Sequence, residues 1–250
     1  MCTSLTLTLA RAMTVRFPPN ELLNDPADHY LCLSHAARIR LNAFFNDRTR
    51  GPGAHLVKKV DCPGAPTEPQ DMWLCADMEL LGCTRAPKVL TYVGEEGDKA
   101  KGTILHGCIY KVVNVTERVV EVEMLRDYWK PMPKRQPTAD DDHDSDADDE
   151  FSDDDEDTED PREYPGVVVL SHEDASKYLR LQHALTYASV QGRTMRDKKV
   201  VMLDMARLNM RHLMVASSRV TAGKFLRCAS PAAQNRLLEA IAAWESERAP

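Results

Sequence analysis

The sequence contains no run of 18 apolar residues and no pair of cysteines in a C-x-x-C arrangement. The first absence argues against a transmembrane helix, which needs about 20 mostly apolar residues to cross a bilayer. The second absence, with the odd total of seven cysteines, argues against a zinc ribbon or a disulfide framework. The amino-terminal residues lack a basic stretch ahead of their apolar ones, so a signal peptide is not expected. We therefore expect an intracellular protein with free thiols in a reducing compartment, nuclear or cytoplasmic.

A phosphate loop of the form G-x-x-x-x-G-K-[ST] is also missing from the 250 residues. In nucleotide-driven motors of the P-loop class this loop supplies the amides and the lysine that hold the phosphates of ATP. A magnesium-binding acidic pair is not recognisable in the sequence either. We therefore expect no ATP hydrolysis by this chain alone.

The charge is distributed unevenly along the chain. Residues 140–160 contain 15 Asp and Glu and no Lys or Arg, so the formal net charge of −7 becomes +8 for the other 229 residues. A basic folded part suits a polyanionic partner such as nucleic acid. The acidic run itself cannot fold, because like charges repel and Phe151 is its only large apolar residue. The sequence therefore predicts a disordered acidic loop.

Three functions are open for this acidic loop. The simplest is that it increases solubility. A second is that it mimics nucleic acid and occupies a basic groove of the same chain, and a third is that it docks a basic protein. Ser145 and Ser152 stand beside acidic residues, which suits an acidophilic kinase.

The apolar patterns of the first half predict a strand and a helix followed by a β-rich segment. A strand at 29–33 precedes Ser34, which is placed to cap a helix over the next thirteen residues. Residues 50–70 are rich in Gly and Pro and predict a loop. Residues 108–115 and 118–122 are separated by two residues and predict a hairpin.

The patterns after the acidic run predict short buried strands that alternate with helices. We expect a helix from the N-cap Ser171 to about Leu181, and a final helix opened by Ser230 and Pro231. Such alternation implies an α/β domain with a largely parallel sheet. The remaining elements that we expect are strands at 167–170, 185–188 and 199–203, a short helix at 206–212 and a strand at 212–216.

Four segments occur in an order that has a known parallel. They are residues 30–42 (YLCLSHAARIRLN), 105–115 (LHGCIYKVVNV), 185–194 (LTYASVQGRT) and 214–220 (MVASSRV). Together they resemble motifs in the second RecA-like domain of superfamily 1 DNA helicases, in the branch of RecD-like and eukaryotic repair helicases. The resemblance implies a RecA-like (P-loop NTPase-type) fold with a small β-rich insertion, and a part in the unwinding of DNA during replication or repair.

The segments also depart from the family pattern. Tyr187 and Ala188 stand where the helicases usually have an isoleucine or valine followed by histidine. His106 replaces a common asparagine, and Ser217 replaces a leucine. The missing histidine matters most, because that position often touches nucleic acid in the family.

The resemblance assigns roles to particular residues of this chain. Arg219 would act as an arginine finger that reaches the γ-phosphate of ATP across the cleft to a neighbouring domain. Gln191 would share in the nucleotide-sensing network with Arg219. Nucleic-acid contacts would come from Thr186, Ser189, Gln191, Gly192, Arg193 and Thr194, where the glycine permits a close approach of the backbone to phosphate.

On this interpretation the chain has five parts along its length. We expect a lead-in segment with one short helix at 1–27, the first part of a helicase-like domain with its β-rich insertion at 28–137, a disordered acidic insert at 138–162, the second part of the domain with the last two motifs at 163–229, and a carboxyl-terminal helix at 230–250.

Three functions follow for such a chain. The first is a helicase-derived domain that binds single-stranded nucleic acid and completes an ATPase site in trans, with ATP and Mg²⁺ held by a partner that supplies the phosphate loop. The second is an inactive helicase remnant that serves as a binding scaffold. The third is an unrelated structural protein whose basic surface packs against an acidic partner.

Overall fold

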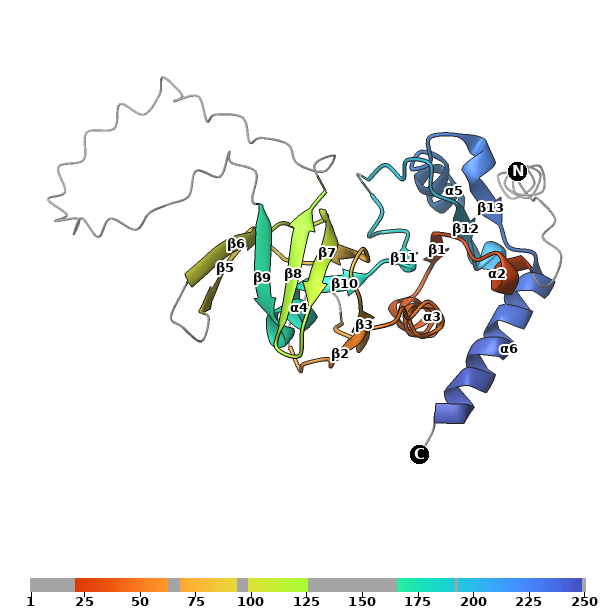
Figure 1. The fold of residues 1–250 in the computed structure, drawn as a ribbon. Helices are drawn as coiled ribbons and strands as arrows, with labels where there is room; N and C mark the ends of the chain where they lie inside the picture. The colour runs from red at the N-terminus through yellow and green to blue at the C-terminus, as the bar shows by residue number, and fades with distance from the viewer. Residues whose placement is uncertain (1–20, 63–67, 94–98, 126–165, 192, 249–250) are drawn as a thin grey trace, which may run out of the picture.

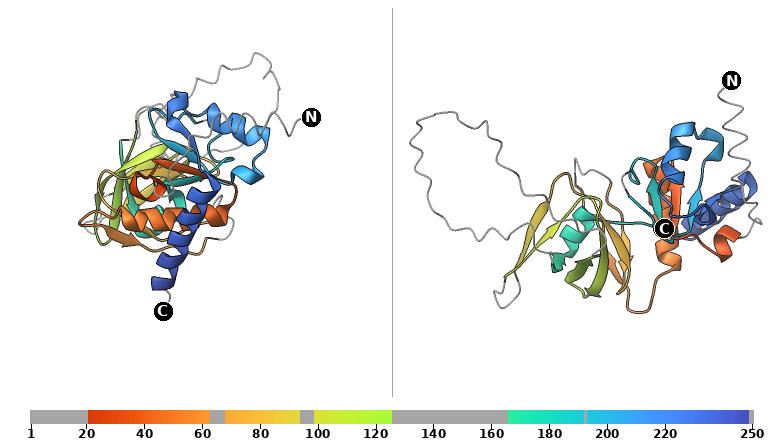
Figure 2. Two further views of the ribbon diagram at one scale, coloured as in Figure 1. Left: turned by 90° about the vertical axis from the view of Figure 1, so that its right-hand side faces the viewer. Right: turned by 90° about the horizontal axis from the view of Figure 1, so that it is seen from above.

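A computed structural model of the chain describes residues 21–62, 68–93, 99–125, 166–191 and 193–248. Their two larger sheets, one parallel and one antiparallel, lie side by side, as Figures 1 and 2 show. None of the helices in these ranges is long and apolar enough to cross a membrane. The acidic run at 140–160 lies outside the described residues.

The parallel sheet has the strand order β11-β1-β12-β13. Its strands are β1 (His29–Cys32), β11 (Ala184–Thr186), β12 (Val200–Met202) and β13 (Leu226–Cys228). Every pairing within it is parallel. Short, almost wholly apolar strands such as these fit a sheet that is covered on both faces. The expected α/β class with a parallel sheet is confirmed.

Helices cover both faces of this sheet because neighbouring residues of each strand point in opposite directions. On one face Tyr30 and Val201 pack against α3 (His35–Arg48) and α6 (Pro231–Arg248). The Tyr30 ring stacks on Phe45 at 4.6 Å between centroids. On the other face Leu31 and Met202 pack with Leu213 of α5 (Met210–Ser217).

Two helix starts agree with their capping residues. The Ser34 side chain accepts a hydrogen bond from the amide of Ala37 at the start of α3, at 3.1 Å. The Ser230 hydroxyl accepts one from the amide of Ala233 at 3.2 Å, with Pro231 in the first helical position of α6. A short helix, α2 (Glu21–Asn24), precedes β1.

The antiparallel sheet has the order β10-β4-β7-β8-β9. Its strands are β4 (Glu79–Gly82), β7 (Ile109–Val115), β8 (Val119–Met124), β9 (Val167–Ser171) and β10 (Leu179–Leu181). The expected hairpin is formed by β7 and β8. Helix α4 (His172–Tyr178) joins β9 to β10. Two small ribbons flank the sheet, β2 (His55–Val57) with β3 (Met72–Leu74), and β5 (Lys88–Val93) with β6 (Lys99–Ile104).

The topology makes the antiparallel part an insertion in the parallel one. The chain leaves the parallel sheet after α3 and comes back through β10, which passes into β11 after only Gln182 and His183. β11 then pairs with β1. The strand expected at 167–170 is formed as β9, but it pairs antiparallel with β8 and does not join the parallel sheet.

Some expected elements are wrong. Residues 212–216 are not a strand but part of α5, which begins at the N-cap Asn209. Asn209 accepts from the amide of His212, and the His212 ring accepts from the amide of Asn209, so a capping box starts the helix. The expected helix at 206–212 is correspondingly displaced, and only a 3₁₀ turn at Met205–Arg207 precedes α5.

Several strands were not expected, among them β2 and β13, and one helix is shorter than expected. β13 follows α5, and β2 lies within the presumed loop at 50–70. The helix capped by Ser171 ends at Tyr178 and not near Leu181, because Leu179, Arg180 and Leu181 form β10 against β4. These short strands have little periodicity of their own and depend on partners that are distant in sequence.

Asn42 of α3 fastens the helix to the passage from β10 into β11. Its side-chain amide donates to the carbonyls of Leu181 (3.3 Å) and Ala184 (3.1 Å) and accepts from the amide of Ala184 (2.7 Å). The side chain is fully buried. It therefore satisfies backbone groups that no water reaches.

We expect Asn42→Ala to lower the free energy of unfolding by about 3 kcal/mol, because it leaves buried backbone donors and acceptors unpaired. Urea denaturation followed by circular dichroism measures this change. Asn114→Ala, at an exposed position of β7, should change it by less than about 0.5 kcal/mol. Equal effects of the two substitutions would contradict the role given to Asn42.

His183 gives the fold a dependence on pH. Its burial, and secondarily the charge of His29, lowers the pKa of the His183 ring from 6.5 to about 4. Between pH 6.5 and pH 4 the His183 ring therefore binds a proton in the unfolded chain but not in the folded chain. Stability rises with pH across that window, so it should fall by up to about 3 kcal/mol from pH 6.5 to pH 4. Urea titrations at several pH values should show a shallower dependence for His183→Gln and an unchanged one for His106→Gln, which is exposed.

Candidate nucleic-acid interface

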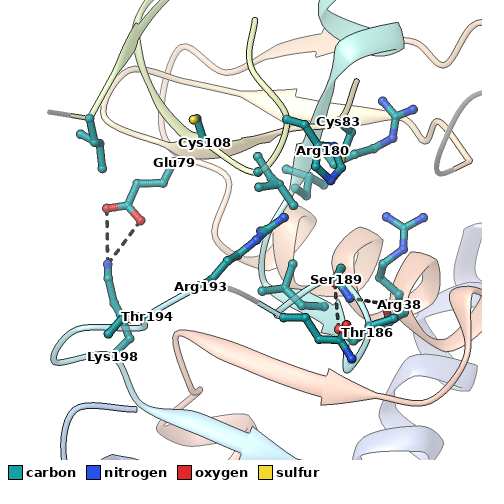
Figure 3. A pocket seen from close by; sticks show the side chains of 18 of the residues that line it. Arg38, Glu79, Cys83, Cys108, Arg180, Thr186, Ser189, Arg193, Thr194 and Lys198 are labelled. Carbon is teal, nitrogen blue, oxygen red and sulfur yellow. Dashed lines mark hydrogen bonds and ion pairs between the residues drawn. The ribbon is translucent and has the colours of Figure 1, made fainter. Parts of the chain in front are cut away.

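A cavity of about 820 Å³ lies where the two sheets meet. The parallel sheet contributes Leu185 and Thr186 at the carboxyl end of β11, and the antiparallel sheet contributes Glu79 of β4 and Arg180 of β10. Arg38 of α3 closes one side, as Figure 3 shows. The carboxyl ends of parallel strands are where open α/β sheets present their ligand crevices.

The loop after β11 folds as a series of tight turns. The Thr186 carbonyl accepts from the amide of Ser189 (3.0 Å), and the Val190 carbonyl accepts from the amide of Arg193 (3.2 Å). Tyr187 and Val190 are buried and anchor the loop, and the Tyr187 hydroxyl donates to the carbonyl of Leu203 at 3.3 Å. The residues between these anchors face the cavity as a result.

The structure brings together most of the residues that the motifs singled out. The cavity is lined by five of them: Thr186, Ser189, Gln191, Arg193 and Thr194. The sixth, Gly192, lies outside the described residues. Gln191 and Thr194 are exposed, so their side chains are open to a ligand.

Two of the five already take part in the turn. The Ser189 hydroxyl donates to the carbonyl of Thr186 at 2.8 Å, and the Ser189 amide also approaches the Thr186 hydroxyl at 3.3 Å. Thr186 is buried. The side chains of Thr186 and Ser189 thus stabilise the turn. The resemblance implied a different role for them, namely contacts with phosphate.

Arg219 does not line the cavity but lies against the same loop. Its Nη1 donates to the carbonyl of Arg193 at 3.3 Å, and its Nε and Nη2 donate to the Ser218 hydroxyl at 3.1 and 2.9 Å. The backbone joins the two segments as well, since the amide of Met195 donates to the carbonyl of Arg219 at 2.6 Å. The last two motifs are therefore in contact, and the Arg219 side chain is half-buried between them.

The cavity is strongly basic. Glu79 is the single carboxylate among its lining residues, against five guanidinium and ammonium groups: Arg38, Arg180, Arg193, Arg196 and Lys198. Lys198 lies 3.4 Å from Glu79, whose other contact is the amide of Gln182 at 2.9 Å. The remaining excess of positive charge favours an anionic ligand.

The sequence interpretation missed four of these five cations. Arg196 and Lys198 follow the QGRT segment directly, so their proximity to it was a signal that could have been used. Arg38 and Arg180 are almost fully buried. Arg180 stands between two leucines in a strand buried along its whole length, and a charge inside an apolar run was the available signal.

The site shows no fit for a metal ion. Within the described ranges no cluster of three or more His, Cys, Asp or Glu side chains could hold one. The single cavity carboxylate, Glu79, is already paired with Lys198.

Comparison with known proteins gives matches among solved structures alone. No protein-family model and no curated protein matches the sequence. A structure of Bacteroides Pif1 helicase with ADP-AlF3 and single-stranded DNA aligns at TM-score 0.45 and 15% identity, over 97% of this chain and 50% of that one. Pif1 from Candida albicans aligns at TM-score 0.45 and 14% identity, over 96% and 54%.

A third match is a structure of two coordinating Pif1 helicases at forked double-stranded DNA, with TM-score 0.45 and 15% identity over 97% of this chain and 48% of that one. All three of these structures are of Pif1 helicases. The chain spans about half the length of these helicases.

Proposed function

We propose that this chain is a helicase-derived domain that binds single-stranded nucleic acid in the cavity between its two sheets. The observation that supports this most is the cavity itself, which combines five Lys and Arg side chains, a single carboxylate and the loop of the LTYASVQGRT segment. Phosphate neutralisation by such cations supplies much of the affinity of proteins for nucleic acid.

The residues of the loop are suited in particular to contacts with the sugar–phosphate backbone of a bound strand. Arg193 and Arg196 offer charge, while the exposed Gln191 and Thr194 offer neutral hydrogen bonds. Such contacts position a strand without reading its sequence. The described lining residues include no Phe, Tyr or Trp on which bases could stack. We therefore expect binding with a strong salt dependence and little sequence preference.

The proposal extends to a partner. A separate first RecA-like domain would bring the phosphate loop and bind Mg²⁺ and ATP, while this chain would add Arg219 to that site in trans. Arg219 suits the role chemically, because a guanidinium stays charged and binds phosphate through two nitrogens. To do so it must exchange its exposed contact with Ser218 and its partly buried contact with the Arg193 carbonyl for the phosphate.

The alternative is an inactive remnant that uses the same basic cavity as a scaffold. It shares the strand-binding site with the first proposal and differs only in the use of Arg219. The two are therefore separated by ATP hydrolysis and not by binding.

For strand binding, we expect fluorescence anisotropy with a labelled single-stranded DNA to show affinity that falls steeply with salt concentration. Arg196→Ala should reduce the slope of log K against log salt by about 0.7, the contribution of one phosphate contact on a single strand. Arg236→Ala removes an equal charge from an exposed position on α6, away from the cavity, and should leave the slope unchanged. Absence of binding by the unmodified chain would refute the proposed function.

For the ATPase role, we expect hydrolysis only when a first RecA-like domain of a superfamily 1 helicase from the same source is added. Arg219→Ala should then lower the rate by about a thousandfold or more, the usual effect of removing an arginine finger. Strand binding by this variant should remain, because Arg219 does not line the cavity. An unchanged rate in a phosphate-release assay would favour the inactive alternative.

A further inference from the structure

Glu79 and Lys198 form an ion pair that joins the two sheets across the cavity. Glu79 is the first residue of β4 in the antiparallel sheet, and Lys198 lies two positions before β12 of the parallel sheet. The Lys198 ammonium is 3.4 Å from each oxygen of the Glu79 carboxylate, and Figure 3 shows the two side chains reaching toward each other. Glu79 is also the single carboxylate among the described lining residues. One negative charge thus lies among the cations of the proposed strand-binding site.

Gln182 holds the Glu79 carboxylate in position. Its side-chain amide donates to one of the Glu79 oxygens at 2.9 Å. Gln182 is itself buried, and its carbonyl lies 2.8 Å from Nδ1 of the buried His29 ring. These contacts do not involve Lys198, so the carboxylate keeps its place at the cavity wall when the ammonium moves.

Lys198 is held more loosely than Glu79. A distance of 3.4 Å is long for a charge-assisted hydrogen bond, which usually spans about 2.7–2.9 Å. The Lys198 and Glu79 side chains are 37% and 33% exposed, and ion pairs with such access to water contribute little to stability. The flexible four-carbon stem of lysine also lets its ammonium turn to a second acceptor. Lys198 can therefore exchange Glu79 for another anion at a small cost in free energy.

We propose that Glu79 competes with the bound strand for Lys198 and thereby limits the affinity of the cavity. Lys198 follows Arg196 in the loop after β11, and both line the cavity, so a backbone phosphate held by this loop comes within reach of the ammonium. When the phosphate takes the ammonium, the Glu79 charge is left uncompensated and attracts a cation from solution. This uptake offsets the counterion that the strand releases, so the Lys198 contact adds little to affinity or to salt dependence. The inference rests on the proposed function and names the residue that regulates the same site.

A double-mutant cycle with strand binding as the readout tests the competition. Fluorescence anisotropy with a labelled single-stranded DNA is recorded over a salt series for the unmodified chain, Glu79→Gln, Lys198→Gln and the double variant. Near 0.15 M salt, charges more than about 8 Å apart are largely screened. Glu79→Gln should there bind about three- to fivefold more tightly, with a slope of log K against log salt that is steeper by up to about 0.7. In the Lys198→Gln background the same substitution should change the affinity by less than about twofold.

Glu117→Gln is the matched control for the loss of a carboxylate. Glu117 is exposed in the turn between β7 and β8, at the opposite end of β7 from Cys108, which lines the cavity. This variant should keep both the affinity and the salt slope of the unmodified chain. Thermal unfolding is followed for every chain, and the Tm of Glu79→Gln should lie within about 2 °C of the unmodified value, because the half-exposed ion pair contributes little to stability. A much larger fall in Tm would show that the ion pair is a structural link between the sheets and would overturn the proposal.

The remaining outcomes separate this inference from the proposed function. If Glu79→Gln tightens binding equally with and without Lys198, Glu79 acts by general repulsion of the strand; the competition is then wrong, and strand binding stands. If Glu79→Gln leaves binding unchanged in both backgrounds, the competition is likewise wrong. If none of the four chains of the cycle binds the strand, the proposed function fails and this inference fails with it.

Discussion

The contact between the Asn42 amide and the backbone beside Ala184 is the interaction on which the site depends. It fixes α3 to the point where the antiparallel part of the chain re-enters the parallel sheet. Because Arg38 lies one helical turn before Asn42, the same contact fixes Arg38 relative to β10 and β11. The neutral Asn42 side chain therefore helps to fix the elements around the cavity. The charged residues of the cavity project from elements that are already held in place.

Long, capped elements could be predicted from the sequence. α3 and α6 begin where Ser34 and Ser230 indicated, and the β7–β8 hairpin follows from its alternating pattern. The three-residue strands β2, β10 and β13 could not, because such segments are stable only through pairing with remote strands. The strand expected at 212–216 is instead part of α5, because the capping box at Asn209 starts a helix that continues through these residues.

Only part of the site could be predicted from the sequence. The residues that are close together along the chain were predictable, and those that are far apart were not. The loop after β11 is a local unit, so Gln191, Arg193 and Thr194 share a surface for reasons visible in the sequence. Arg38 and Arg180 are 142 positions apart and become neighbours of one cavity only through the insertion topology. A local pattern cannot show that two such charges will face the same space, although it can show that each is unusual in its apolar surroundings.

The insertion topology also determines how the chain tolerates change in its length. His29 at the start of β1 contacts Gln182 just before β11, which lies 153 positions further along the chain. Loop-closure entropy grows only with the logarithm of loop length, about 0.6 kcal/mol for each doubling. The acidic run of residues 140–160 falls in the connection between β8 and β9, two strands that pair with each other. Halving or doubling the length of that connection should therefore cost so little free energy that both sheets are kept.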